Sequence, residues 1–148
     1  AYPYLLRPEG TLYGVTRAIR TAIYWGADVV NVSAAAKGAT IFHWHALVKT
    51  SVKAADGGVI VLVTAGNSGG SASKYYPCNT PGFLCVGGID VPTKTAHPDS
   101  NHGSRIDIWG PYTHLWSTPN PDSGGSDLQV LHRRLDLRLL AWALGGAD

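Results

Sequence analysis

The sequence predicts an α/β fold in which a parallel sheet is flanked by helices. Apolar residues recur at helical spacing ahead of each of two short strand-like segments. One of these segments, Val59-Ile60-Val61-Leu62-Val63, is apolar throughout, which is typical of a strand covered on both faces of a parallel sheet. Alternation of helix and strand is typical of right-handed crossover units. The length of 148 residues fits a single domain.

The first half of the chain is predicted to contain two helices and two strands. Apolar residues at helical spacing predict a helix from Val15 that stops at Gly26, and a second helix over 40–55. The short, β-branched segment 28–33 predicts a buried strand, and the apolar run 59–63 predicts another.

The second half has a different composition. Glycine, serine, proline and asparagine dominate residues 66–82, which predicts a long surface loop. Strands are expected at 83–89 and 105–109, and a shorter one at 115–118. Residues 127–148 are rich in leucine and arginine, resemble nothing earlier in the chain, and include a candidate helix.

Composition argues against several classes of protein. Charged residues make up 15% of the chain, against roughly 25% in an average domain, so a disordered tail or a coiled coil is not expected. The 12 basic residues cluster only at His132-Arg133-Arg134, so no nucleic-acid partner is expected. No stretch approaches the roughly 18 apolar residues of a membrane span, so no membrane partner is expected. The oligomeric state stays open.

Two cysteines, Cys78 and Cys85, bracket a short segment. They are too few for a zinc site, which usually needs four ligands. A short-loop disulfide is the favoured interpretation, with two buried thiols as the alternative. A disulfide implies an oxidising compartment, so a secreted or extracellular location is expected, although residues 1–10 carry no signal peptide. Because methionine is absent, the chain is expected to be a processed product or a fragment.

The stretch 59–70 carries the clearest chemistry. A predicted buried strand ends there in a glycine-rich turn that contains Asn67. Ligands of parallel α/β sheets bind at the carboxyl ends of strands, where a fixed asparagine can aim its amide N–H at developing negative charge. A phosphate cradle fits poorly, because Lys74 has no Gly-Lys-Ser/Thr context and the glycines do not follow Gly-x-Gly-x-x-Gly.

Five segments, in the correct order, resemble those of the subtilisin-like serine endopeptidases (subtilases, peptidase S8). AGNSG at 65–69 resembles the family's Ala-Gly-Asn-x-Gly oxyanion motif. The other four segments are GADVVNVS at 26–33, YPC at 76–78 with CVGGID at 85–90, SNHGSRIDIW at 100–109, and STP at 117–119. The resemblance implies an incomplete, three-layer subtilisin-like catalytic domain over 1–126, followed by an unmatched tail at 127–148.

The resemblance also implies roles for matched residues. Asn67 would donate its side-chain amide to the oxyanion that forms when a nucleophile attacks a peptide carbonyl. Two segments would contact a peptide or protein substrate, one pairing with its backbone and one forming a wall of the pocket for the side chain before the scissile bond: Ser33, Ala34 and Ala35, and Thr64, Ala65 and Gly66. As in the family, the peptide bond before Pro77 would be cis.

The catalytic triad is where the sequence departs from the family. The family's Asp and His lie in Asp-Thr/Ser-Gly and His-Gly-Thr-His motifs, and neither motif occurs here. His43 and His45 lie in a predicted helix without such a context. The nucleophile motif Gly-Thr-Ser-x-x-x-Pro has its nearest match at Gly124-Gly125-Ser126, which lacks the Thr and the Pro. Ser126 is retained as a candidate, with a helix N-cap as the alternative role.

Two functions stay open at this point. The first is a fragment of a serine endopeptidase that cleaves peptide bonds through an acyl-enzyme, with this chain inactive alone. The alternative is a non-catalytic, protease-derived domain that holds a peptide strand at 33–36. No metal or cofactor motif is identifiable, although the family often binds calcium. A third interpretation treats the chain as a non-functional product whose tail is read from a shifted frame or a retained intron.

Overall fold

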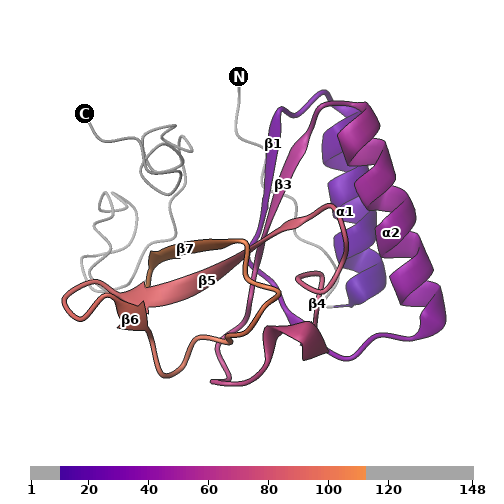
Figure 1. Ribbon diagram of the computed structural model, residues 1–148. Coiled ribbons are helices and arrows are strands. Elements are labelled where there is room, and N and C mark those ends of the chain that lie inside the picture. Colours follow the sequence, from indigo (N-terminus) through magenta and orange to yellow (C-terminus); the bar gives the residue numbers. More distant parts are fainter. Residues whose placement is uncertain (1–10, 113–148) are drawn as a thin grey trace, which may run out of the picture.

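The computed structural model describes residues 11–112, which form a mostly parallel sheet with two helices on one side of it (Figure 1). In chain order the elements are α1 (Leu12–Tyr24), β1 (Val29–Val32), β2 (Ala36–Lys37), α2 (Ile41–Asp56), β3 (Ile60–Thr64), η1 (Ala72–Lys74), β4 (Tyr75–Tyr76), β5 (Leu84–Asp90), β6 (Thr95–Ala96) and β7 (Ile108–Pro111). The predictions for the strand at 115–118, for Ser126 and for the tail at 127–148 lie outside the described residues. Neither helix of the described part is long and apolar enough to cross a membrane.

The main sheet has the order β1-β3-β5, and both β6 and β7 pair with β5. The pairs β1–β3, β3–β5 and β5–β7 are parallel, and only β6 runs antiparallel to its neighbour. Between β1 and β3 the chain crosses over through α2, as a parallel pair requires. The predicted α/β fold with a parallel sheet flanked by helices is therefore confirmed.

Both helices form where apolar periodicity predicts them, and each begins after a threonine cap. The side chain of Thr11 accepts a hydrogen bond from the backbone N–H of Gly14 at 3.0 Å, and that of Thr40 accepts one from His43 at 3.3 Å. Beyond the end of α1, Gly26 adopts a φ of 74°, a left-handed conformation that favours glycine. The predicted helix stop at Gly26 is thus confirmed.

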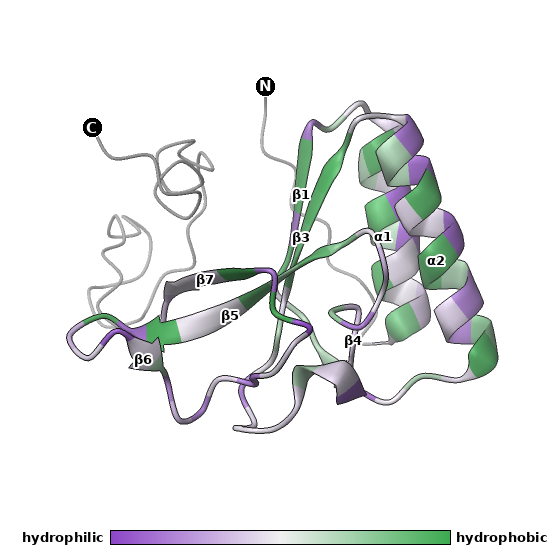
Figure 2. Cartoon of the chain, in the orientation of Figure 1, coloured by the Kyte–Doolittle hydropathy of each residue, from purple (hydrophilic) through white to green (hydrophobic). Residues whose placement is uncertain are grey.

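The core lies between the helices and the sheet. Residues 61–63 of β3 are all buried, as expected of a strand covered on both faces, and Ile19 and Leu47 of the two helices belong to the same buried cluster as Val61 and Val63. Figure 2 shows that β3 and most of β1 consist of hydrophobic residues. The prediction that β1 is buried is wrong: Val29, Val30 and Val32 are half-buried and Asn31 is exposed, because β1 is the edge strand of the described sheet.

The segment 66–82 is not the surface loop that its composition predicts. It contains η1 and β4, and the side chains of Pro77, Cys78 and Thr80 are fully buried. The predicted disulfide is present and ties Cys78 to Cys85 in β5. The peptide bond before Pro77 is cis, as the resemblance implies. Composition identified the turns but not the burial, because the burial follows from contacts with strands distant in sequence.

The Thr11 cap allows a direct stability test. We expect Thr11→Ala to lower the free energy of unfolding by about 1 kcal/mol, because the first turn of α1 loses its side-chain acceptor. Thr21→Ala, in the interior of the same helix, is the matched control, since the Thr21 side chain makes no hydrogen bond within residues 11–112. Urea titrations of both variants measure the difference, and equal midpoints would contradict a capping role for Thr11.

Candidate functional site

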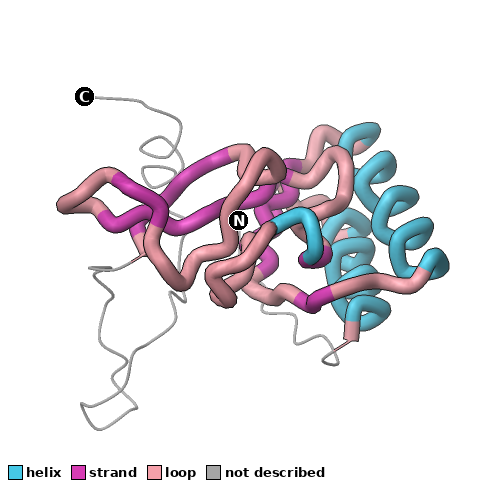
Figure 3. The backbone as a smooth tube through the Cα atoms, turned by 60° about the horizontal axis from the view of Figure 1, so that its bottom comes forward, coloured by secondary structure: helices cyan, strands magenta, loops and turns pink. Residues whose placement is uncertain are grey.

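The candidate site lies at the carboxyl ends of β1 and β3, at the lower end of these strands in Figure 1. Because the register pairs Val32 with Val63 in parallel, Ser33 follows β1 at the same end of the sheet as Thr64, the last residue of β3. Figure 3 turns this end forward and shows loops gathered around the short helix η1. A Cβ built on Gly66 would lie 3.4 Å from the Cβ of Ala35, so the two predicted substrate segments are in contact.

Asn67 is exposed in the turn that follows β3. Its side chain makes no hydrogen bond with any of residues 11–112, so neither of its two amide N–H groups has a partner among them. Its position at the carboxyl end of a buried parallel strand agrees with the predicted location. Donation to an oxyanion stays a prediction.

A fully buried side chain, Asn101, holds the turn that carries Asn67. Its Nδ2 donates to the carbonyl of Ala65 at 2.7 Å, and its Oδ1 accepts from the backbone N–H of Gly70 at 2.9 Å and of Ser68 at 3.2 Å. Its backbone N–H donates to the carbonyl of Gly66 at 2.9 Å. In the sequence, Asn101 stands out only as part of the segment 100–109 that resembles the family, because no local pattern identifies partners more than 30 residues away.

The segment around Asn101 is itself fixed to the sheet. The backbone N–H of Gly88, in β5, donates to the Ser100 hydroxyl at 2.8 Å, and that hydroxyl donates to the Asn101 carbonyl at 3.0 Å. Further along the turn, His102 donates its backbone N–H to the carbonyl of Gly70 at 2.8 Å. The loop 97–103 therefore connects the candidate site to β5.

The predicted substrate edge follows β1 without a break. Ser33 and Ala35 are exposed and Ala34 is half-buried. The Nδ2 of Asn31 donates to the Ser33 hydroxyl at 3.0 Å, which orients this side chain along the chain. An accessible segment beside the turn of Asn67 is what a strand-addition mode requires, and pairing with a substrate backbone stays a prediction.

The predicted pocket wall is less accessible than the substrate edge. Thr64 is half-buried, and its hydroxyl accepts a hydrogen bond from the backbone N–H of Gly66 at 3.2 Å. Ala65 is 1% exposed and its methyl group belongs to the hydrophobic core. Any contact of this segment with a substrate would therefore use Thr64 and the backbone. The wall stays a prediction.

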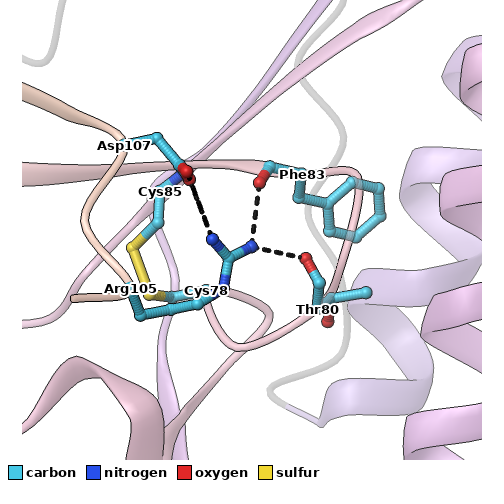
Figure 4. Close-up of polar contacts among 6 residues, drawn as sticks. All are labelled: Cys78, Thr80, Phe83, Cys85, Arg105 and Asp107. Atoms are coloured by element: carbon cyan, nitrogen blue, oxygen red, sulfur yellow. Dashed lines mark hydrogen bonds and ion pairs between the residues drawn. A yellow bond between two sulfur atoms is a disulfide. The ribbon is translucent and has the colours of Figure 1, made fainter.

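A guanidinium group organises the disulfide loop beside the sheet (Figure 4). Arg105 donates to the carbonyls of Thr80 at 2.8 Å and Phe83 at 3.1 Å, and to the carboxylate of Asp107 at 3.0 Å. The same carboxylate accepts from the backbone N–H of Cys85 at 2.8 Å. These bonds join the loop to the entry of β7 and satisfy carbonyls that the turn leaves without strand partners.

His43 and His45, which lack the family's His motif, do not belong to the candidate site. His43 and His45 are in the first half of α2, as predicted, and neither side chain bonds to residues 33–35 or 64–67. Within residues 11–112, no three His, Cys, Asp or Glu side chains form a group that could hold a metal ion. Calcium binding, which the resemblance allows, stays a prediction.

Comparison with known proteins gives the same family from independent directions. A model of the subtilase family (peptidase S8) matches residues 2–127. The chain is 30% identical over 113 residues to Subtilisin DY of Bacillus licheniformis, which covers 74% of this chain and 39% of that protein. It is 39% identical over 70 residues to Subtilisin-like protease 1 of Pseudogymnoascus destructans, covering 47% of this chain and 17% of that protein.

Solved structures agree with the fold. A cold adapted subtilisin-like serine proteinase superimposes with a TM-score of 0.58 at 25% identity, over 70% of this chain and 36% of that one. A lanthipeptide protease superimposes with a TM-score of 0.66 at 23% identity, over 77% of this chain and 38% of that one. The chain thus spans less than two fifths of each of these four relatives. Because the family model matches most of the sequence, the chain belongs to the subtilase family.

Proposed function

We propose that this chain carries the oxyanion-binding and substrate-pairing part of a subtilisin-like serine endopeptidase that acts on peptides or proteins. The proposal is supported mainly by the exposure and the hydrogen bonding of the Asn67 side chain. Its side chain is exposed at the carboxyl end of β3 and has no hydrogen-bond partner in the described residues, while the turn that bears it is held by a buried residue. A side-chain amide whose backbone is fixed, and which has no partner among the described residues, is suited to donate to the negative charge that forms in the transition state.

The chemical reason lies in the acyl-transfer reaction. Attack on a peptide carbonyl moves a full negative charge onto its oxygen, and a donor already in position stabilises that charge without reorganising. Removal of such an asparagine from subtilisin, a member of this same family, costs about 2.7–4 kcal/mol of transition-state stabilisation. In this proposal Asn67 has that role.

The proposal places the substrate backbone along Ser33, Ala34 and Ala35. These residues follow β1 directly, and Ala35 lies against Gly66 of the oxyanion turn. A peptide paired with this edge would pass beside Asn67, so binding and charge stabilisation would use adjacent backbone segments. A secreted location belongs to the proposal and is supported by the Cys78–Cys85 disulfide, since such bonds persist in oxidising compartments.

The 148-residue chain is expected to bind peptides without hydrolysing them. Neither family motif for the catalytic Asp and His occurs in its sequence, and a Ser nucleophile without its base is a poor one. The test combines a fluorogenic peptide panel with a fluorophosphonate that labels reactive serines, and uses Subtilisin DY as the active control. Peptide turnover that is lost as the fluorophosphonate labels the chain would contradict the prediction, and the labelled peptide would identify the nucleophile.

A non-catalytic domain that only holds a peptide strand remains the second candidate, favoured by the same missing motifs. The two candidate functions predict different affinities for a charged tetrahedral ligand. An oxyanion site prefers a peptide phosphinate over the unmodified peptide, whereas a strand-binding surface treats the two alike.

A further inference from the structure

We infer that Asn101 is a positioning residue that fixes the oxyanion donor Asn67 by bonding to the backbone on both of its sides. The inference rests on the proposed function of Asn67 and deepens it. Two peptide groups join Asn67 to its neighbours. The carbonyl of the first, on Gly66, accepts from the Asn101 backbone N–H at 2.9 Å, and the N–H of the second, on Ser68, donates to Asn101 Oδ1 at 3.2 Å.

The two bonds restrict the backbone of Asn67. Rotation about its φ and ψ angles would move one or both of the flanking peptide groups away from Asn101. Only the two torsions of the Asn67 side chain then remain free, and they sample a few staggered positions. Asn101 therefore determines where the Cβ of Asn67 lies and in which direction its amide extends.

The other two bonds of Asn101 close the turn at its ends. Nδ2 donates to the carbonyl of Ala65 at 2.7 Å, and Oδ1 accepts from Gly70 at 2.9 Å, so one side chain spans residues 65–70. Both acceptor positions of its Oδ1 are thereby used. The side chain fits because residue 66 is glycine: a Cβ there would lie 2.7 Å from Nδ2 of Asn101.

Asn101 can act as a fixed reference because its own surroundings are rigid. Its exposed fraction is 0%, and its carbonyl is bonded to Ser100, whose hydroxyl is bonded to Gly88 of β5. A short chain of hydrogen bonds thus fixes the position of Asn67 relative to the sheet. A donor held this way loses little entropy when a charged ligand arrives, and a displacement of about 1 Å in such a site can cost about a hundredfold in rate.

The test compares two ligands of identical sequence, an unmodified peptide and a peptide phosphinate whose tetrahedral, charged phosphinyl group stands for the oxyanion intermediate. Calorimetry gives the ratio of the two affinities for the full 148-residue chain. We expect the wild-type chain to prefer the phosphinate, and Asn101→Leu to lower that preference by about tenfold to a hundredfold. In the Asn67→Ala background, Asn101→Leu should lower it no further, because the donor it positions is already gone.

A matched variant separates positioning from general destabilisation. Thr50 is also buried, at 1% exposure, and its hydroxyl donates only to the carbonyl of Ala46 within α2. Thr50→Val is expected to lower stability and leave the affinity ratio unchanged. A ratio that falls equally in Thr50→Val and Asn101→Leu would overturn the inference, as would an unchanged ratio in Asn101→Leu.

Hydrogen exchange provides a readout that does not depend on either variant folding. In the wild-type chain the amides of Ser68 and Gly70 should exchange slowly, although Ser68 is exposed, and the amide of Asn67 should exchange fast because it has no acceptor in the described residues. Fast exchange at Ser68 and Gly70 would overturn the inference. If the wild-type chain shows no phosphinate preference while these amides are protected, the proposed function fails instead.

Discussion

Replacing Arg105 with methionine is expected to lower the free energy of unfolding by about 2–3 kcal/mol. The guanidinium donates to the carbonyls of Thr80 and Phe83. Without it the Thr80 carbonyl keeps only the longer bond from the Phe83 N–H, at 3.3 Å, and the Phe83 carbonyl loses this partner, which costs about 1–3 kcal/mol when buried. The ion pair with Asp107 adds little, because the Arg105 and Asp107 side chains are 22% and 34% exposed and solvent screens them. Methionine keeps most of the aliphatic volume, so the change isolates the polar contacts.

Guanidinium chloride titration measures this effect. Arg20→Met is the matched control, because Arg20 is exposed on α1 and makes no hydrogen bond or ion pair in residues 11–112. We expect the midpoint of Arg20→Met to stay near the wild-type value and that of Arg105→Met to fall clearly below it. Equal midpoints would mean that the disulfide alone organises the loop between Cys78 and Cys85.

The substitution Gly66→Ala is expected to be at least as damaging, at about 3 kcal/mol. Residue 66 has a φ of 95°, where a Cβ costs roughly 1–2 kcal/mol. The new Cβ would also meet Nδ2 of Asn101 at 2.7 Å and push this buried side chain off the carbonyl of Ala65, which adds about 1–3 kcal/mol. The amides of Ser68 and Gly70 should then exchange faster, since they share the same acceptor.

Gly58→Ala separates the two contributions to this effect. Gly58 also has a positive φ, of 67°, but a Cβ there meets nothing within 4 Å. Its substitution should therefore carry the backbone cost alone, about 1–2 kcal/mol. Differential scanning calorimetry of both variants gives the comparison, and a Gly66→Ala no less stable than Gly58→Ala would refute the steric contact with Asn101.

Local patterns in the sequence predicted most of the fold. The helices around Ile19 and Leu47 show apolar residues at helical spacing, and residues 60–63 of β3 are all apolar. Both kinds of element can therefore be predicted from short segments of the sequence. The stop at Gly26 follows from its tolerance of a positive φ. Burial of a strand depends instead on its neighbours, which is why the edge strand β1 was predicted to be more buried than it is.

The candidate site was predicted only in part, because local sequence patterns identify a residue only when its partners lie close to it in the chain. Asn67 could be identified because its strand and its glycines lie next to it in the sequence. Asn101 could not, because its function comes from bonds to a turn more than 30 residues earlier. Arg105 was missed for the same reason, since its carbonyl partners Thr80 and Phe83 carry no side-chain signature of that contact.

The oxyanion role of Asn67 is tested most directly by a crystal structure of the chain with a peptide phosphinate bound. We expect a phosphinyl oxygen to lie about 2.7–3.1 Å from Nδ2 of Asn67, with the peptide backbone running along residues 33–35. A phosphinate group bound elsewhere, or an Asn67 amide that points away from it, would show that Asn67 is not the oxyanion donor.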